Sequence, residues 1–175
     1  MYKNAKDVGR QGRNFEVTMR FVLGLLEEKN LETEKMHGQG KADCIVKKGV
    51  TLECKSGCGW LVSPIYDTPY QAQKALDNGD IKMLRAMFVA YIPCYDGTNL
   101  HETRILTQKA FINIFSRFGK LRIKKSSANG KYGITIQSYI PTPTFKASQT
   151  VYQGILQALA EEGMTIEQFA NKMGL

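Results

Sequence analysis

Two acidic residues and a lysine stand at a spacing that brings them together on a predicted β-hairpin. The apolar segments Cys44–Val46 and Val50–Cys54 flank a Lys-Lys-Gly turn, which is typical of a hairpin. Because side chains alternate along a strand, Glu53 and Lys55 share one face, and Asp43 is expected opposite them. This trio suits the binding of a divalent metal and the activation of a water beside a phosphodiester.

The chemistry explains why these residue types are needed. Mg²⁺ takes oxygen ligands, usually one or two carboxylates together with water and substrate phosphate. Asp43 and Glu53 are the candidate carboxylates, and the backbone carbonyl of Cys54 is a candidate third ligand. A bound metal lowers the pKa of its water. Lys55 is then placed to orient that water or to stabilise charge in the transition state.

The arrangement resembles the PD-(D/E)XK nuclease superfamily. The match is Ala42-Asp43 followed by Glu53-x-Lys55 across a hairpin turn, with Ala where the family motif has Pro. That Pro carries no chemistry in the family. The resemblance implies a restriction-endonuclease-like core, Mg²⁺ as cofactor with Mn²⁺ as a substitute, and cleavage that leaves 5′-phosphate and 3′-hydroxyl ends.

The resemblance extends upstream of the hairpin and covers Gly9 to about Ser56. The segment Gly12-Arg13-Asn14-Phe15-Glu16 is similar to the opening of archaeal-type Holliday-junction resolvases and Mrr-type restriction nucleases. In those proteins a glycine-rich, basic loop leads into a helix whose Glu faces the metal site. The resemblance therefore implies that Glu16 is a catalytic and metal-site residue, acting directly or through water. It also places Arg10 and Arg13 among the candidate nucleic-acid contacts.

Each of these residues also has a purely structural interpretation. Asp43, Glu53 and Lys55 are compatible with the solvent face of an ordinary hairpin. A Glu early in a helix, as expected for Glu16, is favoured by the helix macrodipole. Gln71 and Gln73 are possible site residues, because some families in the superfamily place a glutamine after the lysine.

Positive charge indicates a polyanionic partner. The 175-residue chain has a formal net charge of +8, and one segment without acidic residues concentrates much of it. We expect that segment to contact phosphates: Arg117, Lys120, Arg122, Lys124, Lys125 and Lys131. Lys41, in the glycine-containing loop before Asp43, is another candidate. The alternative is a solvated edge hairpin whose lysines oppose aggregation.

The four cysteines and the polar N-terminus favour an intracellular protein. The first six residues lack an apolar stretch, so we expect no signal peptide and a cytoplasmic, nucleoid-associated location. The cysteines are then expected to be reduced thiols. Cys44 and Cys54 are expected in the core, on the hairpin face opposite the acidic residues.

Hydrophobic periodicity predicts an α/β (α+β) fold with a central mixed sheet flanked by helices. Helices are expected over Phe15–Leu26, over Tyr70–Leu76, and from a Thr107 cap through Phe118. Further strands are expected over 31–36, 83–92 and 103–106. A basic hairpin is expected over 117–137, with Leu121–Lys125 and Tyr132–Gln137 as strands and Asn129-Gly130 in the turn.

A boundary near residue 141 divides a nuclease-like core, 1–140, from a helical C-terminal extension, 141–175. The extension is expected to hold a helix over Gln149–Ala160 and a second one, Glu167–Gly174, preceded by a capping box at Thr165. The second helix looks like the first half of a helix-turn-helix or a dimerisation element.

Together these features predict a metal-dependent DNA endonuclease of the restriction, homing or junction-resolving type, acting on double-stranded or branched DNA. Cleavage of both strands favours a homodimer or a larger homo-oligomer. Three alternatives stay open: a DNA-binding module with a degenerate site, an RNA-processing nuclease and a protein-interaction scaffold.

Overall fold

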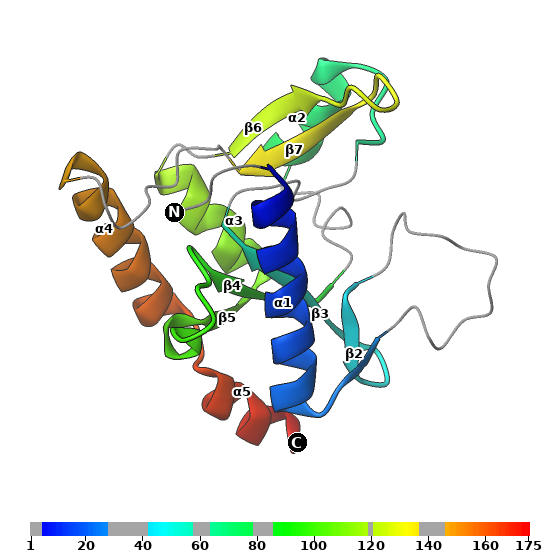
Figure 1. The fold of residues 1–175 in the computed structure, drawn as a ribbon. Coiled ribbons are helices and arrows are strands. Elements are labelled where there is room, and N and C mark those ends of the chain that lie inside the picture. The colour runs from blue at the N-terminus through cyan, green and yellow to red at the C-terminus, as the bar shows by residue number, and fades with distance from the viewer. Residues whose placement is uncertain (1–4, 28–41, 58–63, 79–85, 119–120, 137–145) are drawn as a thin grey trace.

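A computed structural model describes residues 5–27, 42–57, 64–78, 86–118, 121–136 and 146–175. The predicted strand over 31–36 lies outside these residues. Within them the chain forms a mixed sheet covered by helices on both faces, as the sequence predicts at this level (Figure 1). No helix in these ranges is long and apolar enough to cross a membrane.

The main sheet has five strands in the order β1-β2-β3-β4-β5. β2 (Cys44–Lys47) runs antiparallel to both of its neighbours, β1 (Leu26–Glu27) and β3 (Val50–Ser56). β4 (Phe88–Ile92) lies parallel to β3, and β5 (Arg104–Thr107) lies antiparallel to β4. β3 is therefore an interior strand, whose two neighbours run in opposite directions.

Helices cover both faces of this sheet. On the face that we call the α1 face, α1 (Ala5–Leu23) and α5 (Ile166–Met173) pack with the buried side chains of Leu52, Phe88 and Ala90. On the α3 face, α3 (Gln108–Arg117) and α4 (Lys146–Glu162) pack with Val89, Tyr91 and Leu106. All five residues of β4 are buried, because both of its faces are covered.

The basic hairpin forms a separate two-stranded ribbon. β6 (Leu121–Lys125) pairs antiparallel with β7 (Tyr132–Ile136), and Gly130 takes a φ of +70° in the predicted turn. Ile134 of the ribbon and Leu76 of α2 (Pro69–Asp77) join the hydrophobic cluster on the α3 face. The ribbon and α2 therefore lie together at one end of the molecule, on that face of the sheet (Figure 1).

The first helix differs from the prediction at both ends. It begins at Ala5 instead of Phe15, and it ends at Leu23 because Gly24 takes a left-handed φ of +65°. The segment with Gly9 and Gly12, which the family resemblance places in a loop before the helix, is therefore part of the helix. Phe15, Met19 and Leu23 bury one stripe of the helix, which offsets the roughly 1 kcal/mol that an interior glycine costs.

The other described elements follow the prediction closely. Two helices carry the expected threonine caps, at Thr107 and Thr165, and Thr68 caps α2 in the same way without having been predicted. The strand predicted over 83–92 begins only at Phe88 in the described residues, and α4 extends beyond its predicted ends to Lys146–Glu162.

The C-terminal helices contribute to both hydrophobic clusters. Ile155 and Leu159 of α4 are fully buried on the α3 face, whereas Phe169 of α5 is fully buried on the α1 face. Met164, between the two helices, exchanges backbone hydrogen bonds with Ile105 of β5. The proposed boundary near 141 lies outside the described residues, and the helix-turn-helix interpretation stays a prediction.

Candidate active site at the end of strand β3

The alternation of β3 separates the candidate chemistry from the core. Cys54 is buried among the side chains of the α1 face. Glu53 and Lys55 pair in parallel register with Val89 and Tyr91, so they point to the α3 face. The sequence prediction that Cys54 points away from Glu53 and Lys55 is confirmed.

Asp43 lies just before β2, next to the same part of β3. The pair Cys44↔Leu52 continues by one step to place Asp43 beside Glu53. Asp43 Oδ2 accepts a hydrogen bond of 2.7 Å from the backbone N–H of Cys54. Because the N–H and C=O of one strand residue point to the same neighbour, the Cys54 carbonyl also points toward the side of Asp43.

Glu53 and Lys55 form a close ion pair. Lys55 Nζ lies 2.5 Å from Glu53 Oε1, and the two side chains are 23% and 13% exposed respectively. Residues at i and i+2 of a strand stand on one face, which makes this contact possible. The pair is therefore a charged group at a largely covered position on the sheet.

Three carboxylates act on Lys55. Burial acts to lower the pKa of this amine, but the negative charges of Glu53, then Asp43, and more weakly Glu16, raise it. The net result is a pKa above the ordinary 10.5. The acidic residues singled out in the sequence are thus near enough to share one electrostatic environment around this amine.

Glu16 reaches this environment from the middle of α1. It follows the fully buried Phe15, which packs on the α1 face, and it is itself half-buried. Its position away from the helix start removes the macrodipole as the reason for a Glu here. Its negative charge acts to raise the pKa of both Lys55 and Cys54.

The thiols beside this site belong to the core. Cys44 and Cys54 are buried, as the sequence predicts, and neither is in a disulfide. The pKa of Cys54 is well above its usual value, because of a hydrogen bond with Cys44, burial, and the charge of Asp43. A thiol in this environment is a poor nucleophile.

Oxygen donors at this site suit a hard cation. Among the described residues, no group of three or more His, Cys, Asp or Glu side chains is arranged to hold a metal ion. Two carboxylates, those of Asp43 and Glu53, do lie side by side, with the Cys54 carbonyl beside them, and these three groups are the candidate ligands. One or two carboxylates completed by water and phosphate is a usual Mg²⁺ arrangement, so these residues fit that ion.

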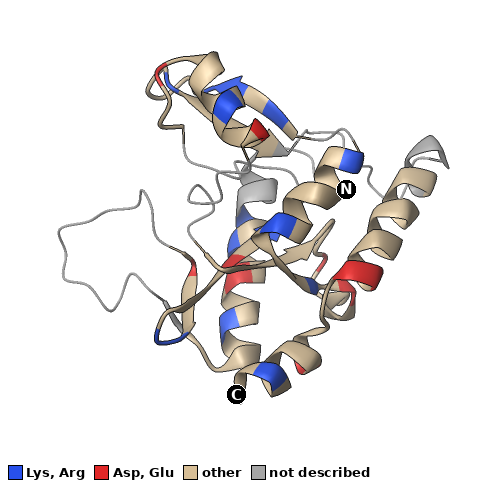
Figure 2. Ribbon diagram, turned by 180° about the vertical axis from the view of Figure 1, so that it is seen from behind, with Lys and Arg blue, Asp and Glu red and all other residues tan. Residues whose placement is uncertain are grey.

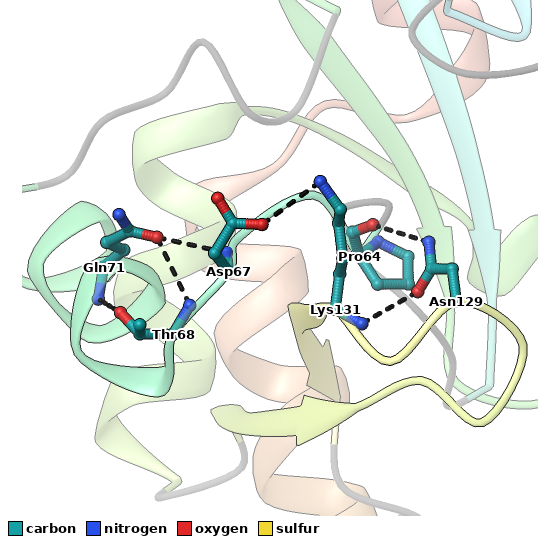
Figure 3. Close-up of polar contacts among 6 residues, drawn as sticks. All are labelled: Pro64, Asp67, Thr68, Gln71, Asn129 and Lys131. Carbon is teal, nitrogen blue, oxygen red and sulfur yellow. Dashed lines mark hydrogen bonds and ion pairs between the residues drawn. The ribbon is translucent and has the colours of Figure 1, made fainter.

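The two candidate glutamines have structural roles at α2. Gln71 Oε1 accepts hydrogen bonds from the backbone N–H groups of Asp67 and Thr68, which completes a capping box (Figure 3). Gln73 Nε2 donates to Asp77 Oδ1, four residues along the same helix. Both side chains are exposed on the helix beside the ribbon and have local partners, and their role in the site stays a prediction.

The ribbon presents most of its basic residues to solvent. Lys and Arg positions mark both the ribbon and α1 (Figure 2). Arg122 and Lys124 alternate with Leu121 and Ile123, which pack into the α3-face cluster, so the two basic side chains point away from those contacts and are exposed. Lys125 is also exposed, with Nζ 5.7 Å from the centroid of the Tyr132 ring.

Two predicted phosphate contacts have acidic partners that the sequence did not indicate. Lys131 Nζ lies 3.2 Å from Asp67 Oδ1 (Figure 3), and Arg117 Nη2 lies 2.5 Å from Glu162 Oε1. In the sequence, Asp67 stands just before Thr68-Pro69, a typical helix start, and this local pattern does not predict an ion pair with a residue 64 positions away.

The remaining predicted contacts divide between α1 and the undescribed segments. Arg10 and Arg13 are exposed on α1. Lys41 and Lys120 lie outside the described residues.

Comparison with protein-family models, curated proteins and solved structures found no match.

Proposed function

We propose that this protein is a metal-dependent DNA endonuclease of the PD-(D/E)XK type, with a restriction-endonuclease-like core. The observation that carries the proposal is the convergence of Asp43, Glu53 and Lys55 at one end of an interior strand. Asp43 is tied to the backbone of Cys54, Glu53 is paired with Lys55, and the charge of Glu16 acts on the same lysine. An ordinary solvent-face hairpin gives no reason for these charges to gather at a largely covered position.

Each residue has a role that its chemistry supports. Asp43 and Glu53, with the Cys54 carbonyl, would hold Mg²⁺, and Glu16 would assist through water. The ion would lower the pKa of a bound water and offset negative charge on the phosphate. The Lys55 ammonium donates hydrogen bonds to the attacking water or to a phosphate oxygen, which favours in-line attack.

The exposed basic residues supply the remaining support for a nucleic-acid substrate. Arg122, Lys124 and Lys125 stand on a ribbon that lies on the same sheet face as Glu53 and Lys55. Basic side chains on such a ribbon bind phosphates without regard to sequence. We infer that the ribbon holds the DNA backbone while the β3 residues act on it.

The test is cleavage of supercoiled plasmid, linear duplex and four-way-junction DNA in Mg²⁺, Mn²⁺ or EDTA. We expect metal-dependent cutting by the native chain, loss of cutting in Lys55→Ala with DNA binding retained, and normal cutting by Lys48→Ala, an exposed lysine in the β2–β3 turn. Undiminished cutting by Lys55→Ala would overturn the site assignment. Tight DNA binding without cleavage of any substrate would favour a DNA-binding module.

A further inference from the structure

The outer face of α1 exposes large apolar side chains toward the C-terminal end of the helix. Phe21 is 84% exposed, and Val17 and Val22 are 51% and 47% exposed. Val17 and Phe21 are four residues apart, so they are neighbours on the helix face opposite the buried stripe. Exposed apolar side chains that gather in one place mark interaction surfaces, whereas scattered ones are ordinary.

An apolar groove lies beside this cluster. It has a volume of about 490 Å³ and is bounded by the C-terminal end of α1, the short 3₁₀ helix η3 (Leu100–Glu102) and α5, which lies at the same end of the molecule (Figure 1). Its apolar lining consists of Val22, Leu23, Leu100, Ile166 and Ala170. Since a cavity of roughly 150 Å³ can hold a benzene ring, this groove has room for an aromatic side chain.

Phe21 and the groove share one surface but do not meet within one chain. Successive residues of a helix point about 100° apart around its axis, so Phe21 points outward while Val22 lines the groove. In a pair of chains related by a two-fold axis beside Val22, each Phe21 would enter the groove of the other chain. A protruding ring next to a groove of suitable size is self-complementary, as a symmetric dimer interface requires.

The charges on the two surfaces are complementary as well. Glu167 lines the groove and is exposed, whereas Arg20 precedes Phe21 in the last turn of α1. The two-fold arrangement brings the positive charge of Arg20 toward Glu167 of the second copy, which favours this orientation of the chains. Because the formal net charge of +8 opposes close approach of two chains, the apolar contact has to supply the affinity.

We propose that this surface forms a homodimer in which Phe21 of each chain fills the apolar groove of the other. An aromatic side chain buried in a pocket at the centre of an interface typically carries a large share of the binding free energy. This inference concerns binding between two copies of the chain, and it does not rest on the proposed nuclease activity.

Sedimentation velocity of the full chain at micromolar concentrations measures the association. We expect the native chain to dimerise and Phe21→Ala to raise the dissociation constant at least about 100-fold, because a symmetric dimer loses the anchor twice and each anchor contributes about tenfold or more. Tyr70→Ala removes an aromatic side chain of α2 that is 74% exposed, so it is the matched control and should dimerise as the native chain does. A native chain that stays monomeric, or equal dissociation in both variants, would overturn the proposal.

A mixture of two variants tests whether the ring enters the groove. Ala170→Phe places a ring in the groove from within the same chain and leaves Phe21 intact, so alone it should dimerise as weakly as Phe21→Ala. Mixed together, the two variants should form a heterodimer, because Phe21 of one chain fits the open groove of the other. The absence of this heterodimer, with both variants folded by circular dichroism, would contradict the arrangement. Phe21 is exposed, so Phe21→Ala should keep the native Tm and the first measurement stays decisive even where Ala170→Phe fails to fold.

Discussion

Asp43 has two separable roles, and substitution distinguishes them. Its carboxylate accepts a 2.7 Å hydrogen bond from the Cys54 N–H, and it places a negative charge beside Glu53 and Lys55. Asp43→Asn retains an acceptor oxygen and removes the charge. Asp43→Ala removes both and leaves the Cys54 N–H without this partner.

The expected stability changes follow from those losses. A hydrogen bond to a charged acceptor contributes about 1.5–3 kcal/mol and a neutral one about 1 kcal/mol, so Asp43→Asn should cost about 1 kcal/mol of unfolding free energy in EDTA. Removal of the charge also relieves repulsion with Glu53 and loses attraction to Lys55, and these two contributions oppose each other. Asp43→Ala should cost about 1–3 kcal/mol, because a backbone donor loses its partner.

Metal binding gives the second part of the measurement. Mg²⁺ at about 100 times its Kd should stabilise the native chain by about 2.7 kcal/mol, and this increment should be absent in Asp43→Asn. Urea unfolding in EDTA and in Mg²⁺, together with plasmid cleavage, measures both roles. Asp67→Asn, which removes an exposed carboxylate paired with Lys131, is the matched control and should retain the Mg²⁺ increment.

Full Mg²⁺ stabilisation and cleavage in Asp43→Asn would refute a ligand role for Asp43. Equal costs for the Asn and Ala variants would refute the hydrogen-bond argument.

Three further outcomes are expected. The folded-state pKa of Lys55 is raised above 10.5, so its ion pair should stabilise the fold fully below that pH and progressively less as the pH rises through the folded pKa. In unfolding measured against pH, Lys55→Met should therefore lose less stability at alkaline pH than the native chain. Replacing Lys124 and Lys125 with Ala should weaken DNA binding for all sequences and lower the salt slope by up to about 0.9 per lost phosphate contact, whereas an unchanged slope would place the DNA elsewhere. Gly163→Ala should lower stability by about 1–3 kcal/mol in thermal unfolding, because its Cβ would lie 2.7 Å from Leu159 O and 2.8 Å from Arg104 Cβ; an unchanged Tm would contradict this packing.

The sequence alone determined the elements that depend on neighbouring residues. The β2–β3 hairpin follows from alternating side chains and from Gly49, whose φ of +79° suits the turn. Alternation also separated Cys54 from Glu53 and Lys55 correctly. The caps at Thr107 and Thr165 were similarly local, since each threonine bonds a backbone group only three residues away.

Tertiary structure decided what depends on residues distant along the chain. The extent of α1 was mispredicted because the helix begins at Ala5 and includes two glycines of unfavourable helix propensity, which the hydrophobic periodicity from Phe15 onward did not indicate. Lys131 and Arg117 form ion pairs with Asp67 and Glu162, which are far away along the chain, and no local sequence pattern predicts such pairs. The effect of the Glu16 charge on the pKa of Lys55 likewise depends on how α1 lies relative to the sheet, because electrostatic effects follow distance in space and not separation along the chain.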